Sequence, residues 1–370
     1  MKHTIWLMET VGLSAHKCGA LIRRFGSAKA ACEASLREVQ QVCLLSLRQR
    51  RAFEKKSFAE ADRILGQCRA QNIEIITLED PRYPPRLKTI YDPPAALYLR
   101  GKLPEFAKPW IAIVGQRKAT PYGLDAAERM AYELSGCGFI VVSGMAEGID
   151  SAAHRGALKG GSPTVAVFGT AIDKCYPAFN AGLMRQILHN GAILSEYPPG
   201  KRGSPGYFPQ RNRIISGLCV GTVIAEAKKK SGSLITAGLA LDQGRDVFAV
   251  PGDINASSCE GTNNLIKQGE AKLVTAAADI AAEYSGLYRL QEIRPRTLSA
   301  VYESRQPVPQ PQPAADEERD EILAAIGSGA HIDEICERSG LDATSVMSRL
   351  TMLELSGRVR QLPGKYFEKI

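Results

Sequence analysis

Four short segments of this chain combine glycines, hydroxyls and cations as anion sites do. The first is Gly115-Gln116-Arg117-Lys118, which directly follows an apolar run at 111–114. Arginine binds phosphate oxygens through a planar fork of N–H donors, so this turn suits a phosphate better than a nicotinamide. The simpler interpretation is that Arg117 makes a surface ion pair.

The second segment, Ser143-Gly144, follows the next apolar run, at 139–142, and leads to Asp150 and His154. These two residues lie four apart and would share one face of a helix. They could act as a general acid and base. A structural interpretation is favoured, in which Asp150 caps the helix and His154 binds a neighbouring loop.

The third segment, 207–217, contains Phe208, Arg211, Asn212 and Arg213. We expect a helix to begin near Pro209 and to expose these side chains at its start. Guanidinium groups, backbone N–H groups and an aromatic ring are the components of a site for single-stranded nucleic acid. The alternative is that Phe208 only packs in the core.

The fourth segment is Ser231-Gly232-Ser233, which follows three lysines at 228–230. Hydroxyls at the start of a helix can hold an anion, or they can simply cap the helix. The lysines add positive charge near the other three segments.

These glycine turns lack the motifs of the common nucleotide cofactors. Gly115-Gln116-Arg117 has one glycine where the dinucleotide fingerprint has three, and no Gly-Lys-Ser/Thr follows a strand. The nine cysteines include no Cys-x-x-Cys pair, which argues against zinc or redox chemistry. The sequence predicts no cofactor, no metal and no catalytic residue.

The elements that must position these segments alternate between strand and helix. Apolar runs at 111–114, 139–142, 164–168, 192–196, 220–225 and 246–250 predict buried strands, and helical patterns separate them. This alternation predicts an α/β fold with a doubly wound, mostly parallel, Rossmann-like sheet. Because ligands of such sheets gather at the carboxyl ends of the strands, the four segments should meet there.

We expect four parts along the chain. Residues 1–70 have helical patterns that resemble a helix-hairpin-helix or SAM-like module, and residues 71–285 form the sheet domain. Residues 286–315 are a proline-rich linker. In 316–370, helices at 316–326, from 331 and at 342–355 precede two strands around Pro363-Gly364, which is the pattern of a winged helix.

The composition agrees with a basic protein of the reduced cytosol. The 370 residues carry a formal charge of +8, which favours a polyanionic partner. No apolar run is as long as a membrane span, and the first residues lack a secretory signal. We therefore expect a cytoplasmic location and no contact with a membrane.

Many motifs of the sheet domain, in order, resemble the DprA/Smf family of DNA-processing proteins from natural transformation. They cover roughly residues 73–285 and include VGQRKATPYG (114–123), VVSGMAEGIDSAAHRGAL (141–158), YPAFN (176–180), FPQRNRIISGL (208–218) and EAKKKSGSLITAGLAL (226–241). The resemblance implies an extended Rossmann-like domain that binds single-stranded DNA, forms a homodimer, protects incoming strands and loads the RecA recombinase. It implies neither a cofactor nor catalysis.

The resemblance also implies a set of DNA-binding residues. Family motifs place Gly115, Arg117, Phe208, Arg211 and Arg213 in the DNA pocket. Together with the pattern of the four segments, the predicted DNA-binding set is Gly115, Arg117, Lys118, Ser143, Gly144, Lys174, Phe208, Arg211, Asn212, Arg213, Ser231, Gly232 and Ser233.

Two positions depart from the family pattern. Gln116 stands where the family usually has a serine, so a longer amide replaces a small hydroxyl donor. Ala178 stands where several relatives have a lysine, and Lys174 is close enough in sequence to supply that charge instead.

Two other functions remain open from the sequence. One is a nucleotide-processing enzyme on the same sheet, which would use Asp150, His154 and Glu196 around a phosphorylated small molecule. The other is an adaptor whose winged module and dimer surface recruit partners while DNA binding is incidental.

Overall fold

The computed structural model describes residues 1–292, 321–355 and 357–369. The chain divides into two compact units, 1–296 and 297–370, which are considered separately. The first unit contains the N-terminal helices and the sheet, and the second contains the C-terminal module, whose described residues form α16, α17 and α18.

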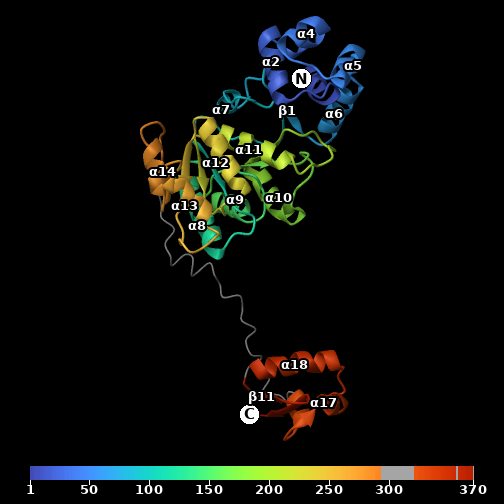
Figure 1. Cartoon of the computed structure of the whole chain (residues 1–370), viewed down its shortest axis with the longest axis vertical. Helices are drawn as coiled ribbons and strands as arrows, with labels where there is room; N and C mark the ends of the chain where they lie inside the picture. The colour runs from blue at the N-terminus through green and yellow to red at the C-terminus, as the bar shows by residue number, and fades with distance from the viewer. Residues whose placement is uncertain (293–320, 356, 370) are drawn as a thin grey trace. The chain divides into compact units, whose positions relative to one another are not determined.

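Short helices form the start of the first unit and gather beside β1 (Figure 1). Serines begin several of them, and the Ser14 side chain caps α2 by accepting a hydrogen bond from the backbone of Lys17. Trp6 and Phe53 form the centre of their core, with ring centroids 5.3 Å apart. The helices are α1 (Lys2–Ile5), the π-helix η1 (Trp6–Thr10), α2 (Ala15–Phe25), α3 (Ala28–Glu33), α4 (Leu36–Val42), α5 (Leu47–Lys55) and α6 (Ala59–Ala70).

The sheet that follows has the strand order β1-β2-β6-β5-β4-β3-β7-β8-β9. Its strands are β1 (Glu74–Thr77), β2 (Ala96–Gly101), β3 (Trp110–Val114), β4 (Ile140–Ser143), β5 (Thr164–Phe168), β6 (Ala192–Ser195), β7 (Gly221–Ile224), β8 (Asp246–Ala249) and β9 (Lys272–Leu273). From β6 to β9 all neighbours are parallel, whereas β1 and β2 add an antiparallel edge. The predicted doubly wound, mostly parallel sheet is confirmed.

Helices cover both faces of this sheet, so its central strands are buried on both sides. Along β3, Ile111 and Ile113 belong to one core cluster, while Ala112 and Val114 belong to another. This explains why the strands appear in the sequence as continuous apolar runs. The helices of the sheet domain are α7 (Pro85–Lys88), α8 (Pro121–Gly136), α9 (Ile149–Lys159), the 3-10 helix η2 (Ala178–Asn180), α10 (Ala181–Asn190), α11 (Tyr207–Leu218), α12 (Gly232–Asp242), α13 (Glu260–Lys267) and α14 (Ala277–Tyr284).

At β3 the order in which the chain adds strands to the sheet changes direction. The chain proceeds from β3 through β4 and β5 to β6 on one side, and it then returns by α11 to β7 on the other side. Such a switch point leaves a crevice at the carboxyl ends of the strands, where α/β proteins bind ligands. The fold therefore places α11 and the turns after β3 and β7 around one crevice.

The second unit contains the helices and strands of a winged helix. Its elements are α16 (Glu321–Ile326), β10 (Ala330–His331), α17 (Ile332–Ser339), α18 (Ala343–Leu355), β11 (Val359–Leu362) and β12 (Tyr366–Lys369). The three strands form one sheet in the order β10-β12-β11, and Ile335, Leu350 and Phe367 are buried in the core. The predicted start of the first helix at Asp316, and most of the predicted linker, lie outside the described residues.

Candidate nucleic-acid interface

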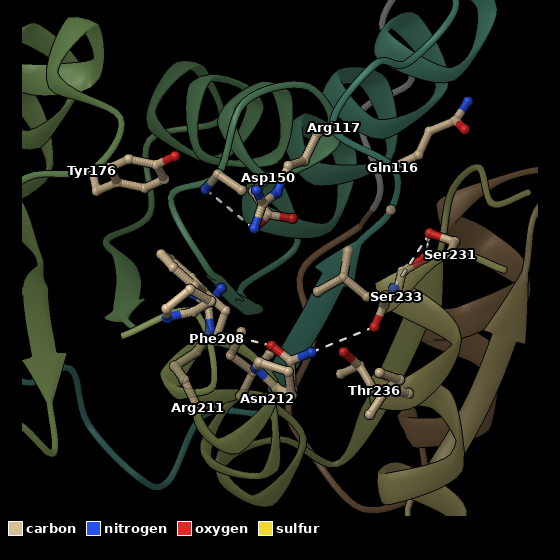
Figure 2. A pocket seen from close by; sticks show the side chains of 18 residues that line it. Gln116, Arg117, Asp150, Tyr176, Phe208, Arg211, Asn212, Ser231, Ser233 and Thr236 are labelled. Carbon is tan, nitrogen blue, oxygen red and sulfur yellow. Dashed lines mark hydrogen bonds between the residues drawn. The ribbon is translucent and has the colours of Figure 1, made fainter. Parts of the chain in front are cut away.

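A cavity of about 540 Å³ opens at the switch point of the sheet. Its walls come from the turn after β3, the turn after β4, the first turns of α11 and the start of α12 (Figure 2). The carboxyl ends of three strands and one crossover helix thus converge on one space. This agrees with the expectation that the segments meet at the carboxyl edge.

The turn after β3 approaches α9 closely. A Cβ atom at Gly115 would lie 2.5 Å from Cγ1 of Ile149, so only glycine fits there without a shift. The backbone N–H of Gln116 donates to the carbonyl oxygen of Glu226 at 2.9 Å, which ties the turn to the end of β7. Arg117 follows this fixed backbone, and its side chain is exposed.

Arg117 belongs to an aromatic group within the cavity. Its guanidinium carbon lies 5.3 Å from the centroid of the Phe208 ring, which is a cation–π contact. The ring of Tyr176 lies 5.4 Å from Phe208 on centroids and is 52% exposed. A Cβ atom at Gly169 would approach the Phe208 ring to 2.8 Å, so the glycine leaves space for that ring.

Arg211 joins α11 to the ends of the central strands. Its guanidinium donates to the carbonyl oxygen of Gly144 at 2.6 Å and to that of Val167, and the side chain is 5% exposed. Burial lowers the pKa of this guanidinium, and the positive charge of Arg117 acts in the same direction. Arg211 still lines the cavity, as part of a fixed wall.

Asp150 fixes the turn after β4. Its carboxylate accepts the N–H groups of Gly144 and Ala146 at 3.1 and 3.3 Å, as a capping side chain does. Burial raises the pKa of Asp150 more than the nearby Arg211 lowers it. Asp150 therefore has a structural role in the turn before α9, but the expectation that it caps the helix is wrong, because α9 begins without a side-chain cap hydrogen bond.

The start of α12 supplies neutral polar groups. Ser231 accepts a hydrogen bond from the backbone of Ser233 and lies 2.8 Å from its hydroxyl. Asn212 donates to the carbonyl oxygen of Gly232 at 3.5 Å. The capping role of Ser231 is confirmed, whereas anion binding there stays a prediction.

The structure brings most of the predicted set into contact with this cavity. Gly144 lies in a small adjoining hollow together with Arg117, Tyr176 and Phe208, and Lys118 lines a second adjoining hollow. The predicted residues that line the main cavity are Gly115, Arg117, Phe208, Arg211, Asn212, Ser231, Gly232 and Ser233.

Three predicted residues lie elsewhere. Ser143 is fully buried, and its hydroxyl donates to the carbonyl oxygen of Ile113 at 2.7 Å, so it links β4 to β3. Lys174 is exposed but does not line these cavities. Arg213 is directed away from the cavity towards Asp92 and Glu196.

Arg213 is buried and pairs with two carboxylates, of which Glu196 is mostly buried and Asp92 is partly exposed. Its guanidinium lies 2.6 Å from a carboxylate oxygen of Glu196 and 2.9 Å from one of Asp92. The expectation that the helix start exposes both arginines is wrong, because Arg211 and Arg213 are only 5% and 7% exposed. Residues two positions apart on a helix differ by about 200° of rotation, so the side chains of Arg211 and Arg213 lie on different sides of α11.

His154, on α9, is fully buried in the core, and the expectation that it binds a neighbouring loop is wrong, because its partner Thr164 is the first residue of β5. The Thr164 hydroxyl donates to the carbonyl oxygen of Val141, so it accepts the Nδ1 proton of His154 at 2.8 Å. Burial lowers the pKa of His154 to about 3. His154 and Glu196 do not line the cavity with Asp150, so the three groups of the enzyme hypothesis do not converge.

Several cavity residues are not among those predicted from the sequence. Tyr176 and Thr236 line the cavity, as do Ile215 and Ile235. Tyr176 carried a usable signal, because it lies in the segment that follows β5 and is therefore at the carboxyl edge. The isoleucines carried none, because an apolar residue on a helix normally indicates the core.

Two other kinds of feature are absent from the described residues. No group of three or more His, Cys, Asp or Glu side chains is placed to hold a metal ion in that part of the chain. Within 1–292, 321–355 and 357–369, no helix combines the length and hydropathy that crossing a membrane requires.

The fold and the cavity define an α/β protein with a cationic and aromatic site at the switch point of a Rossmann-like sheet. Residues 74–285 match the family model for DNA recombination-mediator protein A, and residues 306–365 match the DprA winged-helix domain. The chain belongs to this family of DNA-processing proteins, which confirms the resemblance seen in its motifs.

Named relatives and a solved structure support the same family membership. DprA of Streptococcus pneumoniae is 44% identical over 214 residues, which cover 58% of this chain and 75% of that protein. Protein Smf of Escherichia coli is 35% identical over 87% of this chain and 84% of its own length. The X-ray structure of S. pneumoniae DprA matches with 34% identity and a TM-score of 0.68, covering 76% of this chain and 98% of that one.

A second solved structure describes how Helicobacter pylori DprA binds single-stranded DNA. It matches with 32% identity and a TM-score of 0.53, and the match covers 58% of this chain and 97% of that one.

Removing Arg213 should affect stability and not the cavity. Arg213→Ala leaves the carboxylate of Glu196 buried without its partner, and breaking such a pair costs about 3–5 kcal/mol of unfolding free energy. Urea unfolding measures this loss. The double variant Arg213→Met/Glu196→Leu should recover most of it, and weaker oligonucleotide binding by that folded protein would contradict the structural role.

His154 should make the fold sensitive to mild acid. Because its folded-state pKa lies below the unfolded value of 6.5, the unfolded chain binds more protons, and stability falls as the pH drops through 6.5 towards 3. At pH 5 this loss is about 2 kcal/mol. Urea unfolding at pH 7.5 and 5 should show a smaller acid loss for His154→Gln than for the parent, and equal losses would refute the assignment.

Proposed function

We propose that the chain binds single-stranded DNA in the cavity at the switch point, without sequence preference. This proposal rests on one observation: three kinds of group line the same cavity. An exposed cation, Arg117, lies against the half-buried ring of Phe208, and the exposed ring of Tyr176 lies beside Phe208. Neutral side chains that can bind base edges, Asn212 and Thr236, line the same cavity.

The aromatic pair favours a single strand over a duplex. A base can stack on Phe208 or Tyr176 only when it has left its own stack, and such stacking tolerates any base. Arg117 and Lys118 would then neutralise the phosphates on either side. The DNA-binding mode named for the H. pylori relative supports the same ligand class for this chain.

Gln116 is one of the two positions that depart from the family pattern, and its side-chain amide is a candidate ligand contact. The residue lines the cavity, and its side-chain nitrogen is buried without a hydrogen-bond partner among the described residues. A buried donor without a partner is costly, so a phosphate or base oxygen at this point would satisfy it.

We propose binding without bond breaking. The Asp150 carboxylate is occupied by two backbone N–H groups, and His154 is sealed away from the cavity. The nucleotide-processing alternative would need a free carboxylate and a base at one point. Turnover of nucleotides by the purified protein that disappears in Asp150→Asn would favour that alternative.

Arg117→Ala is the direct test of the site. Losing one charge-assisted hydrogen bond should weaken binding of oligo-dT by about 1–3 kcal/mol. The log–log salt slope should become shallower by roughly 0.7, the value for one phosphate on a single strand. Fluorescence anisotropy over a salt series measures both quantities.

A control variant and a second site variant accompany that test. Arg69→Ala removes an exposed arginine from α6 and should leave affinity and slope unchanged. Phe208→Ala should weaken binding by about 1–3 kcal/mol through lost stacking and leave the salt slope intact. Wild-type affinity in Arg117→Ala would remove this cavity as the binding site.

We further propose, from family membership, a cytoplasmic homodimer that joins through the sheet domain, protects incoming strands and loads a RecA-type recombinase. RecA assembly on oligo-dT should be faster with the full chain than without it, and Arg117→Ala should lose most of this effect. Equal stimulation by Arg117→Ala would favour the adaptor alternative. Sedimentation equilibrium of the full chain tests the dimer.

A further inference from the structure

A second cavity, of about 390 Å³, lies at the opposite edge of the sheet. Its lining includes Trp110, the first residue of β3, and Arg245, which immediately precedes β8. Leu218, the last residue of α11, also lines it, whereas Phe208 of the first cavity lies at the other end of that helix. Ten residues of helix separate the two by about 15 Å, so this is a separate site.

The floor of this second cavity is apolar and aromatic. The ring of Phe106 is 37% exposed and lies 5.4 Å from the ring of Trp110 on centroids. The indole N–H of Trp110 donates to the backbone oxygen of Glu105, so its polar atom is already used. Pro84 and Pro85 add a wall that has no N–H donors.

Three cations surround this floor: Arg86, Lys108 and Arg245. No carboxylate is present among the lining residues that the structure describes. Arg245 is held in place by hydrogen bonds to the backbone oxygen of Arg86 and the hydroxyl of Thr89, at 3.0 and 3.3 Å. Burial lowers the pKa of Arg245, and the charge of Arg86 lowers it further, as expected for a cation without an anion.

The first cavity has several neutral polar side chains in its lining, and the second has very few, so the two cavities should bind different kinds of ligand. Thr89 is the one neutral polar side chain among the described lining residues of the second cavity, and its hydroxyl donates to the backbone of Arg86. A nucleotide base there would find donors for its acceptor atoms, but the lining cations offer no acceptor for its N–H groups, which is unfavourable. A ligand that is apolar at one end and anionic at the other meets no such penalty.

We propose that this cavity binds the acidic C-terminal end of a partner protein. The last side chain of that partner, apolar or aromatic, packs on Phe106 and Leu218. Its α-carboxylate and the acidic side chains before it pair with Arg86, Lys108 and Arg245. Such a pocket combines an apolar anchor with charge complementarity, the arrangement of a binding hot spot.

The test uses the full chain and a fluorescein-labelled peptide, Gly-Gly-Asp-Asp-Asp-Leu-Phe, with a free carboxylate. Anisotropy at low salt should show binding that is about tenfold weaker for the C-terminal amide, which lacks one charged acceptor. Replacing Leu-Phe by Gly-Gly should weaken binding about tenfold as well, because the apolar anchor is lost.

Variants locate the peptide. Arg245→Ala should bind at least tenfold more weakly, and Lys108→Ala, at an exposed position that the fold does not need, should bind a few-fold more weakly. Lys88→Ala on α7 and Arg69→Ala on α6 remove exposed cations outside the cavity and should have no effect. Unchanged binding of oligo-dT by all four variants shows that the fold and the first cavity are intact.

If the peptide binds, three results would still overturn the proposal: equal affinity for the acid and the amide, wild-type binding by both Lys108→Ala and Arg245→Ala, or displacement of the peptide by oligo-dT. The last outcome would make this cavity part of a nucleic-acid path. Failure of the peptide to bind, with oligo-dT binding intact, would remove this inference and leave the proposed function standing.

Discussion

The cavity at the switch point depends on one buried contact, the guanidinium of Arg211 on the carbonyl oxygens of Gly144 and Val167. Charged hydrogen bonds in a low-dielectric interior are strong, and they also repay part of the cost of burying the cation. This contact fixes the first turns of α11 against the ends of β4 and β5. Phe208 and Asn212 flank Arg211 on the helix, so their positions follow from it.

Two glycines leave the space that the side chains of Arg211 and Phe208 occupy. A methyl group at Gly144 would overlap the guanidinium of Arg211, and one at Gly169 would meet the Phe208 ring. The glycines in the strand-end turns suggested a phosphate cradle from sequence, because such cradles use glycine for close backbone approach. Here the groups that approach are protein side chains, and the cations and hydroxyls beyond them remain for a ligand.

Much of the fold could be predicted because its cause is local. Strands buried on both faces require continuous apolar runs, and Ser14 and Ser231 begin helices with side chains that cap them. The roles of the two arginines of α11 could not be predicted, since they depend on distant partners. Asp92 lies 121 residues from Arg213 in sequence, and only the folded sheet brings the two together.

The two cavities share α11, and the packing of that helix limits how they can influence each other. Coupling between sites requires an element with two arrangements whose balance each ligand shifts. Arg211 binds the sheet on one side of α11, and Arg213 binds Asp92 and Glu196 on another. A slide or rotation of the helix would break buried charged contacts on both sides, so the helix has no low-energy second position. If the proposed strand and the proposed peptide bind in these two cavities, each should therefore bind with the same affinity whether or not the other is present.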